Sequence, residues 1–309
     1  MKILLTGGSG YIGTALTPML LEQGHEVTNF DSLLITGYAT IPFFRHPNYS
    51  FIKGDIRDKE SLKKVVEGQD IIIHLAAIVG FPACSKDPSL AYTTNVEGTQ
   101  NLTDLIKPSQ YVLFGSTGSN YGALVDGVCT EETPLNPLSL YGKTKTEAER
   151  MLMEKGNATA YRFATAFGIS PRLRLDLLVN DLTHQAVKQK HMVVYEANFM
   201  RTFIHVHDIA RSFMFAIDNR DKMIGEVFNV GDDRMNFSKR EVCEMIVKKT
   251  NAYVHYADVG EDADKRNYIV SYDKINKLGF QTTISLDEGI EELIKAVQVV
   301  ENKNPYANI

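Results

Sequence analysis

The sequence predicts an α/β fold, in which a doubly wound parallel sheet is followed by a smaller α/β lid. Two observations lead to this prediction. Through the first half, short runs of aliphatic and β-branched residues alternate with helical stretches, which is typical of parallel strands joined by crossover helices. Most of these runs are apolar on both faces, as strands covered by helices on two sides must be. After about residue 165 this alternation stops.

Six strands and four helices are expected in the first half. The strands are Lys2–Thr6, Glu26–Phe30, Phe51–Lys53, Ile71–Ala76, Tyr111–Gly115 and Thr159–Phe163, and the helices are Tyr11–Gln23, Lys59–Glu67, Pro88–Ile106 and Leu138–Glu154. Gly24 and Gly68 directly follow two of these helices, in the position where glycine readily ends a helix. Asp58 precedes one of them as a side-chain cap.

The second half opens with a loop rich in Gly, Pro and Arg, Gly168–Asp176. Further helices are expected at Leu177–Lys188, His207–Asn219, Ser238–Lys248, Tyr272–Leu278 and Leu286–Glu301, and strands at Met200–His205 and Glu226–Val230. We interpret residues 1–165 as one domain, to which the strand at 226–230 returns. Residues 166–309 are then mainly a second, smaller domain over the carboxyl edge of the sheet.

The composition excludes several classes of protein. The 309 residues are 44% hydrophobic and carry a net charge of −5, so no basic surface for nucleic acid is expected. The longest apolar runs are too short to cross a membrane, and the chain begins with a strand pattern instead of a signal peptide. Its three cysteines are far apart and lack metal-ligand spacing. We therefore expect a cytoplasmic protein with neither a metal nor a membrane partner.

A glycine-rich turn follows the first strand. Gly7, Gly10 and Gly13 have the spacing Gly-x-x-Gly-x-x-Gly and lead into a helix that has Tyr11 and Ile12 in its first turn. Glycines in this position permit a tight turn and a close approach of the backbone to a pyrophosphate, which then faces the helix N-terminus. A structural glycine turn is the alternative. The position between a strand and a helix favours a Rossmann dinucleotide site.

Acidic residues follow the next two strands. Asp31 ends the second strand, at about 20 residues from the glycines, where a carboxylate accepts hydrogen bonds from the adenosine ribose. It would repel a 2′-phosphate, so NAD is the expected cofactor in preference to NADP. Asp55 and Ile56 end the third strand, where an adenine can rest. A plain turn or cap residue is the alternative for each of the two acids.

Tyr141 and Lys145 are four residues apart on a predicted helix, and so share one of its faces. A phenol titrates near pH ~10, and a cation held close to it lowers that pKa. One unit charge at about 4 Å contributes roughly 4 kcal/mol at an effective dielectric near 20, which is enough to give a usable phenolate near neutral pH. A surface pair of helix residues without a function is the alternative.

Several further motifs accompany these sites. They are His74–Ala77, Asn95–Thr99, Phe114–Thr117, Tyr121–Gly122 and Arg201–Asp208. Taken together with the glycine turn and the Tyr/Lys pair, they make the chain resemble the extended short-chain dehydrogenase/reductase family, in its nucleotide-sugar epimerase/dehydratase branch, over nearly its whole length. Within that branch, Gly168–Asp181 and Gly260–Val270 look like bacterial enzymes that oxidise C4 of a GDP-linked heptose for capsule synthesis.

This resemblance implies catalytic roles. Tyr141 would be the general base toward the sugar 4-hydroxyl, and Lys145 would lower its pKa and bind the nicotinamide ribose. Thr117 matches the family residue that positions the sugar oxygen, with Ser116 as the alternative. Hydride then passes from C4 to NAD and leaves a 4-keto sugar.

The resemblance also implies that residues 1–165 are an NAD-binding Rossmann domain and residues 166–309 mainly a nucleotide-sugar-binding domain, and it implies binding residues in both. Ala76 and Ala77 would line the cofactor site, and Asn95 would brace the strand turn behind it or be a plain helix residue. For the nucleotide sugar, the candidates are Asn180, Arg201 and Arg266, together with Arg172 and Arg174 on the loop. Arginine suits phosphate because it donates two parallel hydrogen bonds. A solvated cluster is the alternative for Arg172 and Arg174.

The residues after Thr117 bear on the reaction. Dehydratases of this family carry an acid there, whereas this chain has Gly118, and no cysteine of the kind used by the epimerase-reductases is present in the segment. What remains is chemistry at C4. The first prediction is a 4-epimerase, and a 4-dehydrogenase acting on GDP-heptose or another nucleotide sugar is the alternative. A non-catalytic NAD-binding sensor is an alternative from another class.

Assembly is also implied by the resemblance. Relatives pair the helices that match 88–106 and 138–154 across a twofold axis, so we expect a homodimer. Leu138, Leu152 and Met153 are candidates to face the partner, although the same residues suit a core.

Overall fold

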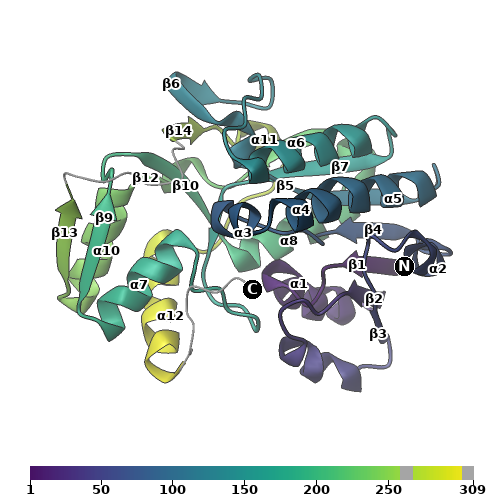
Figure 1. Cartoon of the computed structure of the whole chain (residues 1–309), viewed down its shortest axis with the longest axis horizontal. Coiled ribbons are helices and arrows are strands. Elements are labelled where there is room, and N and C mark those ends of the chain that lie inside the picture. Colours follow the sequence, from purple (N-terminus) through teal and green to yellow (C-terminus); the bar gives the residue numbers. More distant parts are fainter. Residues whose placement is uncertain (258–266, 301–309) are drawn as a thin grey trace.

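The computed structural model describes residues 1–257 and 267–300. Its centre is a seven-stranded sheet with the order β11-β7-β5-β4-β1-β2-β3 (Figure 1). Every strand pair in this sheet is parallel, which confirms the predicted fold class. The strands are β1 (Lys2–Thr6), β2 (Glu26–Asp31), β3 (Tyr49–Lys53), β4 (Ile71–His74), β5 (Tyr111–Thr117), β7 (Ala158–Phe163) and β11 (Val227–Val230).

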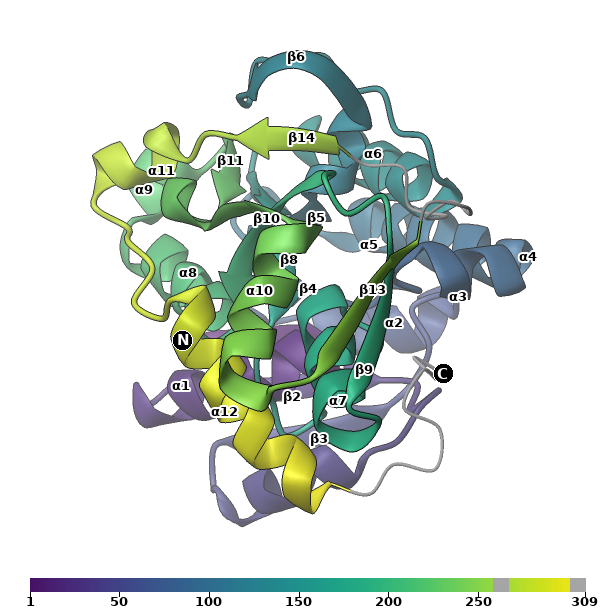
Figure 2. The same ribbon diagram turned by 90° about the vertical axis from the view of Figure 1, so that its left-hand side faces the viewer.

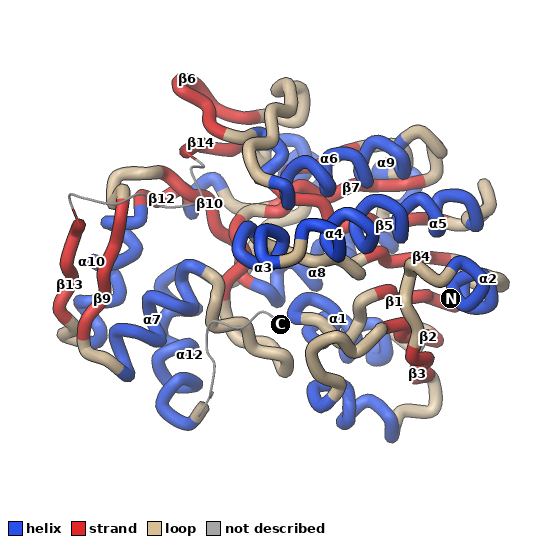
Figure 3. The backbone as a smooth tube through the Cα atoms, in the orientation of Figure 1, coloured by secondary structure: helices blue, strands red, loops and turns tan. Residues whose placement is uncertain are grey.

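Helices cover both faces of this sheet, as Figure 3 also shows. The covering helices include α1 (Tyr11–Glu22) and α8 (Val206–Asp218) on one face, and α2 (Lys59–Val66), α5 (Gly98–Leu105) and α6 (Leu140–Met153) on the other. Alternate residues of β1 enter two different cores: Ile3 and Leu5 pack on the α1 side, and Leu4 on the α2 side. Because both faces are buried, these strands are apolar throughout instead of alternating.

The expected helix over residues 88–106 is interrupted. It consists of α4 (Pro88–Tyr92), a π turn (Thr93–Glu97) and α5. The π turn carries Asn95, whose Oδ1 accepts from the Ile78 amide at 2.8 Å and whose Nδ2 donates to the Ile78 carbonyl at 2.9 Å. A wider helical turn is often found at a functional site. Here the Asn95 side chain on this turn holds the loop that follows β4.

Local signals place most of the other helix ends. Asp58 caps α2 by accepting from the Glu60 and Ser61 amides at 3.1 and 3.2 Å, while Gly24 and Gly68 have φ of 77° and 76°. The shorter helices are η1 (Tyr38–Arg45), α3 (Phe81–Lys86), η3 (Gly118–Tyr121), α9 (Arg220–Met223), η4 (Asp233–Met235) and α11 (Asp273–Leu278).

The second part of the chain adds small sheets and three packed helices, α7 (Leu178–Lys188), α10 (Lys239–Thr250) and α12 (Leu286–Val299), which face the viewer in Figure 2. The additional strands are β6 (Ala123–Cys129), β8 (Thr165–Phe167), β9 (His191–Tyr195), β10 (Met200–His205), β12 (Asn236–Ser238), β13 (Tyr253–Ala257) and β14 (Asn267–Val270). Apart from β10, these strands were not predicted. They are short, and partners such as β9 and β13 are distant in sequence.

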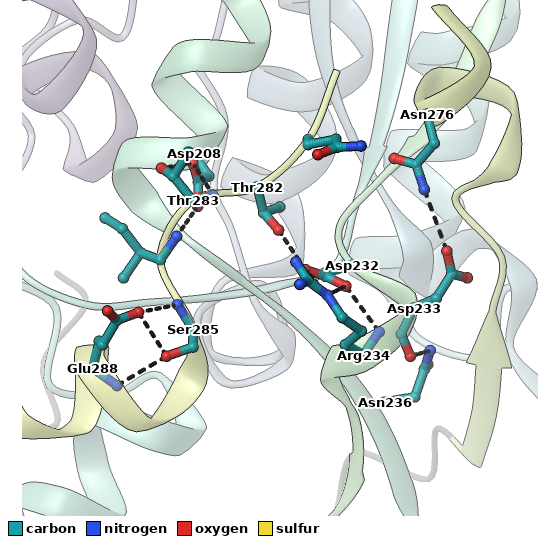
Figure 4. Close-up of polar contacts among 12 residues, drawn as sticks. Asp208, Asp232, Asp233, Arg234, Asn236, Asn276, Thr282, Thr283, Ser285 and Glu288 are labelled. Atoms are coloured by element: carbon teal, nitrogen blue, oxygen red, sulfur yellow. Dashed lines mark hydrogen bonds and ion pairs between the residues drawn. The ribbon is translucent and has the colours of Figure 1, made fainter. Parts of the chain in front are cut away.

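The segment before α12 is fixed to α8 (Figure 4). Asp208 is fully buried and accepts from the amides of Thr283 and Ile284 at 2.9 and 3.0 Å. The Ser285 and Glu288 side chains form a capping box at the start of α12. A buried carboxylate that accepts several backbone hydrogen bonds is well satisfied, so Asp208 acts here as a structural anchor.

The structure corrects the expectation that Leu152 could face a partner subunit. Its side chain is fully buried in the core between α6 and the sheet, so it does not face a partner. Leu138 is half exposed at the start of this region. Among the described residues, no helix combines the length and apolar character needed to cross a membrane.

Candidate active site

A cavity of about 520 Å³ runs along the carboxyl ends of the central strands. It lies where the order of the strands reverses, since β1 has β2 on one side and β4 on the other. Open α/β sheets bind ligands at this switch point. The predicted residues that line the cavity are Gly7, Gly10, Tyr11, Ile12, Gly13, Asp31, Asp55, Ile56, Ala76, Ala77, Thr117, Tyr141, Lys145, Arg172 and Arg174.

The glycine-rich turn requires glycine at two positions. Gly7 has φ of 74°, and a Cβ there would lie 2.6 Å from the Ala76 amide nitrogen. A Cβ at Gly13 would lie 2.5 Å from the Cα of Gly8. The turn therefore packs directly against the loop after β4 and against the start of α1. The first-turn amides of α1 have no partner inside the helix, so the residues present suit a pyrophosphate.

Asp31 and Asp55 lie at the other end of the cofactor path. The Asp31 carboxylate accepts from the Ser9 amide at 3.0 Å and from the Leu33 amide at 2.8 Å. Burial raises the pKa of Asp31, while these two amides lower it. Asp55 is paired with Arg57 at 2.6 Å, and hydrogen bonds from Arg57 hold the pKa of Asp55 below its usual value. Arg57 also lines the cavity, which sequence reasoning missed.

Tyr141 and Lys145 lie on the first two turns of α6, which begins where the Ser139 side chain accepts from the Gly142 amide at 3.1 Å. Lys145 is only 3% exposed, and its Nζ sits 3.9 Å from the centre of the Phe114 ring. Burial lowers the pKa of Lys145 to about 7. Lys145 is thus mostly shielded from solvent, and its charge, where it is protonated, acts more strongly on neighbouring groups than it would in water.

Thr117 and Ser116 have different surroundings, although both line the cavity. Ser116 donates to the buried Glu149 carboxylate at 2.5 Å, and Glu149 in turn is paired with Arg162 at 2.6 Å. Thr117, within the described part of the chain, exchanges hydrogen bonds with Ser119, at 3.1 Å. Because Ser116 is engaged with a carboxylate, the geometry favours Thr117 as the hydroxyl that meets a substrate.

Ser119 and Thr165 also line the cavity and were not singled out from the sequence. Ser119 is two residues beyond Thr117, in the short turn η3, and Thr165 begins β8. Isolated serines and threonines carry no pattern in a sequence. The only sequence signal for Ser119 was its position two residues after Thr117, and Thr165 had none.

Three predicted binding residues do not reach the cavity. Asn95 braces the loop after β4, as described above, so its role is positioning and not contact. The Asn180 side chain accepts from the Gly168 amide at 3.0 Å and donates to the Arg174 carbonyl at 2.8 Å. Arg201 is 2% exposed, and its Nη1 donates to the Met200 carbonyl at 3.1 Å. Asn180 is held by the backbone of Gly168 and Arg174, Arg201 is buried and is not part of the cavity lining, and Arg266 lies outside the described residues.

Other titratable residues near the cavity have structural roles. His74 is buried between Thr6 and Thr99, at 2.7 and 3.1 Å, and burial lowers its pKa to about 3. Cys84 is buried, and its thiol donates to the Ile78 carbonyl. His205 is paired with Glu292 at 2.5 Å. Among the described residues, no three His, Cys, Asp or Glu side chains cluster as metal ligands.

The fold and the site define a dinucleotide-binding protein with a Tyr/Lys pair in its cavity. The family model described as "NAD dependent epimerase/dehydratase family" matches residues 3–231, and the chain belongs to this family of enzymes. Its cofactor is NAD.

Three similar proteins illustrate the range of the family. The Low-salt glycan biosynthesis protein Agl12 of Haloferax volcanii is 28% identical over 95% of this chain and 97% of its own length. The structure of dTDP-glucose 4,6-dehydratase from Bacillus anthracis with NAD has a TM-score of 0.84, with 27% identity and 96% of each chain covered. The structure of UDP-glucuronic acid 4-epimerase from Bacillus cereus, in complex with UDP-glucuronic acid and NAD, has a TM-score of 0.86. It is 26% identical, and the match covers 96% of this chain and 99% of that one.

Proposed function

We propose that this enzyme oxidises C4 of a nucleotide-activated sugar, and that the reaction is a 4-epimerisation through a 4-keto sugar. The proposal rests on the polar groups at the end of the cavity formed by β5 and α6. Thr117, Tyr141 and Lys145 all line the cavity, while the only carboxylates among the described lining residues are Asp31 and Asp55, which lie at or just beyond the carboxyl ends of β2 and β3. Dehydration needs a carboxyl group beside C5 and C6, so this site suits chemistry at C4 alone.

Each side chain has a distinct role in this proposal. The Tyr141 phenolate accepts the proton of the 4-hydroxyl, and the Lys145 ammonium stabilises the phenolate. The Thr117 hydroxyl turns from Ser119 toward the sugar oxygen and holds it. NAD, when bound, would supply the redox chemistry, taking the hydride from C4 and giving it back to the other face of the ketone. Tyr141 then returns the proton to the sugar oxygen, which completes the epimer.

A 4-dehydrogenase is the second candidate. Residues 168–181 resemble GDP-heptose oxidising enzymes, and the Agl12 relative is named for glycan biosynthesis. In that case the substrate would be a GDP-sugar destined for a capsule or other surface polysaccharide, and the ketone would leave. The two candidates differ only in whether the ketone is retained.

Mass spectrometry of a panel of UDP-, GDP-, dTDP- and CDP-sugars distinguishes these outcomes. We expect a product of unchanged mass and new retention time. A product lighter by two hydrogens would assign the dehydrogenase, and one lighter by a water would refute C4-only chemistry. With the active sugar, Tyr141→Phe should lower turnover by about 10²–10⁴-fold. Tyr253→Phe, exposed and outside the cavity, is the control. Undiminished turnover in Tyr141→Phe would exclude Tyr141 as the base.

We also propose a homodimer formed by α4, α5 and α6. These helices pack side by side on one face of the sheet (Figure 1), and Tyr92 and Leu138 are 43% and 50% exposed there. Light scattering should give twice the 34.6 kDa of one chain. Tyr92→Glu should shift the mass toward one chain, because it places a charge in the interface, whereas Tyr253→Glu should not. A monomeric parent protein at micromolar concentration would contradict the proposal.

A further inference from the structure

Thr144 joins two parts of the cavity wall through hydrogen bonds. It lies on α6 between Tyr141 and Lys145, and it is 2% exposed. Its hydroxyl donates to the Tyr141 carbonyl at 3.0 Å and accepts from Asn95 Nδ2 at 3.0 Å. Thr144 is not among the described residues that line the cavity, whereas Tyr141 is one of them. Any effect of Thr144 on the site must therefore pass through its neighbours.

Asn95 extends this connection to the loop that follows β4. Its side chain bonds to both the amide and the carbonyl of Ile78, and the Cys84 thiol also donates to that carbonyl. Asn95 and Ile78 are both buried, and Ile78 lines the cavity. A continuous series of hydrogen bonds thus runs from Ile78 to Tyr141, and the Thr144 hydroxyl is its last link.

The polar groups of this series are well satisfied. Asn95 Oδ1 accepts one hydrogen bond, and Nδ2 donates one to Ile78 and one to Thr144. A buried polar network whose members are all paired holds its parts rigidly. The bond from Thr144 to the carbonyl three residues earlier also fixes the Thr144 side chain against the first turn of α6, from which the Tyr141 phenol extends.

We propose that Thr144 is a positioning residue for the reaction, and that its hydroxyl holds Tyr141 where the phenolate meets the sugar 4-hydroxyl. This inference rests on the proposed function, because it takes Tyr141 as the base. Proton transfer requires the two oxygens to lie within about 2.6–3.2 Å of each other. A displacement of about 1 Å costs on the order of 10²-fold in rate. Thr144 thus acts on turnover through Tyr141, without touching the substrate.

Thr144→Val tests this role, because valine keeps the branched shape of the side chain and removes the hydroxyl. With the nucleotide sugar that the parent converts, kcat should fall by about 10–100-fold. KM should be little changed, since no contact with the substrate is lost. The Kd for NAD, measured by calorimetry, should also match that of the parent and so show that the cavity is intact. Thr144→Ser restores a hydroxyl and should recover most of the turnover.

The pH profile separates positioning from a simple loss of folded protein. If the phenol moves away from the Lys145 ammonium, the phenolate is less stabilised, and the acid limb of kcat should shift to higher pH in Thr144→Val. A smaller folded fraction would instead lower the rate equally at every pH. Thr146→Val is the matched control, because the Thr146 hydroxyl on the same helix has no hydrogen bond within the described part of the chain. It should keep the rate and the profile of the parent.

Hydrogen exchange of the cofactor-free protein adds a readout that needs no substrate. The Ile78 amide donates to Asn95, which loses one partner in Thr144→Val, so this amide should exchange faster than in the parent and in Thr146→Val. Unchanged exchange at Ile78 would show that Thr144 does not hold the loop, and would overturn the inference.

The kinetic outcomes keep this inference distinct from the proposed function. Loss of turnover in Tyr141→Phe but not in Thr144→Val would refute the positioning role alone. A Thr144→Val rate that falls without a shift of the pH profile would refute it as well, because the loss would then be structural. Full turnover in Tyr141→Phe would refute the proposed function, and this inference with it.

Discussion

A Lys145→Met variant is expected to lose turnover by about 10²–10⁴-fold and yet to unfold at a higher temperature than the parent. The loss follows from removal of the cation that stabilises the Tyr141 phenolate. The gain in stability follows because Lys145 is 3% exposed, and its charge is costly to bury. Methionine keeps an unbranched side chain that can pack on Phe114.

The stability difference should depend on pH with a defined sign. The pKa of Lys145 is lowered by burial from 10.5 to about 7 in the folded protein. Between these values the unfolded chain binds a proton that the folded chain lacks, so the stability of the parent rises with pH. The penalty is on the order of 4 kcal/mol at pH ~7, at about 1.4 kcal/mol per pKa unit. It is fully present below that pH and vanishes as pH rises through about 10.

Denaturant unfolding of cofactor-free parent and variant at several pH values measures this difference. Lys143→Met is the matched control, since Lys143 is exposed on the same helix. It should change neither turnover nor stability appreciably. A Lys145→Met protein that is less stable than the parent at pH 7 would show that the ammonium is well paired and not destabilising.

Glu149→Gln is expected to be among the most destabilising single changes in this chain. Glu149 and Arg162 are 4% and 7% exposed and are paired at 2.6 Å. Removing one charge of a buried pair leaves the other uncompensated, which typically costs about 3–5 kcal/mol. Glu149 also accepts from Ser116 and Asn120, so the segment that leads to Thr117 would lose an anchor.

The same substitution should alter the pH profile. The charge of Glu149 raises the pKa of Lys145 against the effect of burial. In Glu149→Gln the pKa of Lys145 should fall further, and activity should decline at a lower pH on the alkaline side. Glu154→Gln is the control, because the Arg150–Glu154 pair on the same helix is 62% exposed on each side. Exposed pairs contribute about 0–1 kcal/mol. Equal losses in the two variants would contradict the argument.

Short-range patterns predicted much of the lining of the cavity. Gly7 and Gly13 are required by sterics within a few residues of chain, and Tyr141 and Lys145 share a face because of helical spacing. The parallel sheet followed from strands that are apolar on both faces. The interrupted helix at Thr93–Glu97 was not predicted, because its cause is a contact between Asn95 and Ile78 on another element.

The substrate side was less predictable from the sequence. Asn180 and Arg201 matched family positions, but both side chains are buried and neither is part of the cavity lining. Arg172 and Arg174 do line the cavity. Their placement depends on how residues 168–176, from the second half of the chain, pack on α1.

The parallel sheet, the glycine turn and the shared helix face of Tyr141 and Lys145 were predictable, because apolar strands, glycine spacing and helical spacing each leave a pattern within a few residues of chain. Only the tertiary structure buries Lys145 over Phe114, joins Ser116 to Glu149 and brings residues 168–176 beside α1. These arrangements join residues far apart in the chain, and their energies arise from burial and charge, which no local pattern encodes.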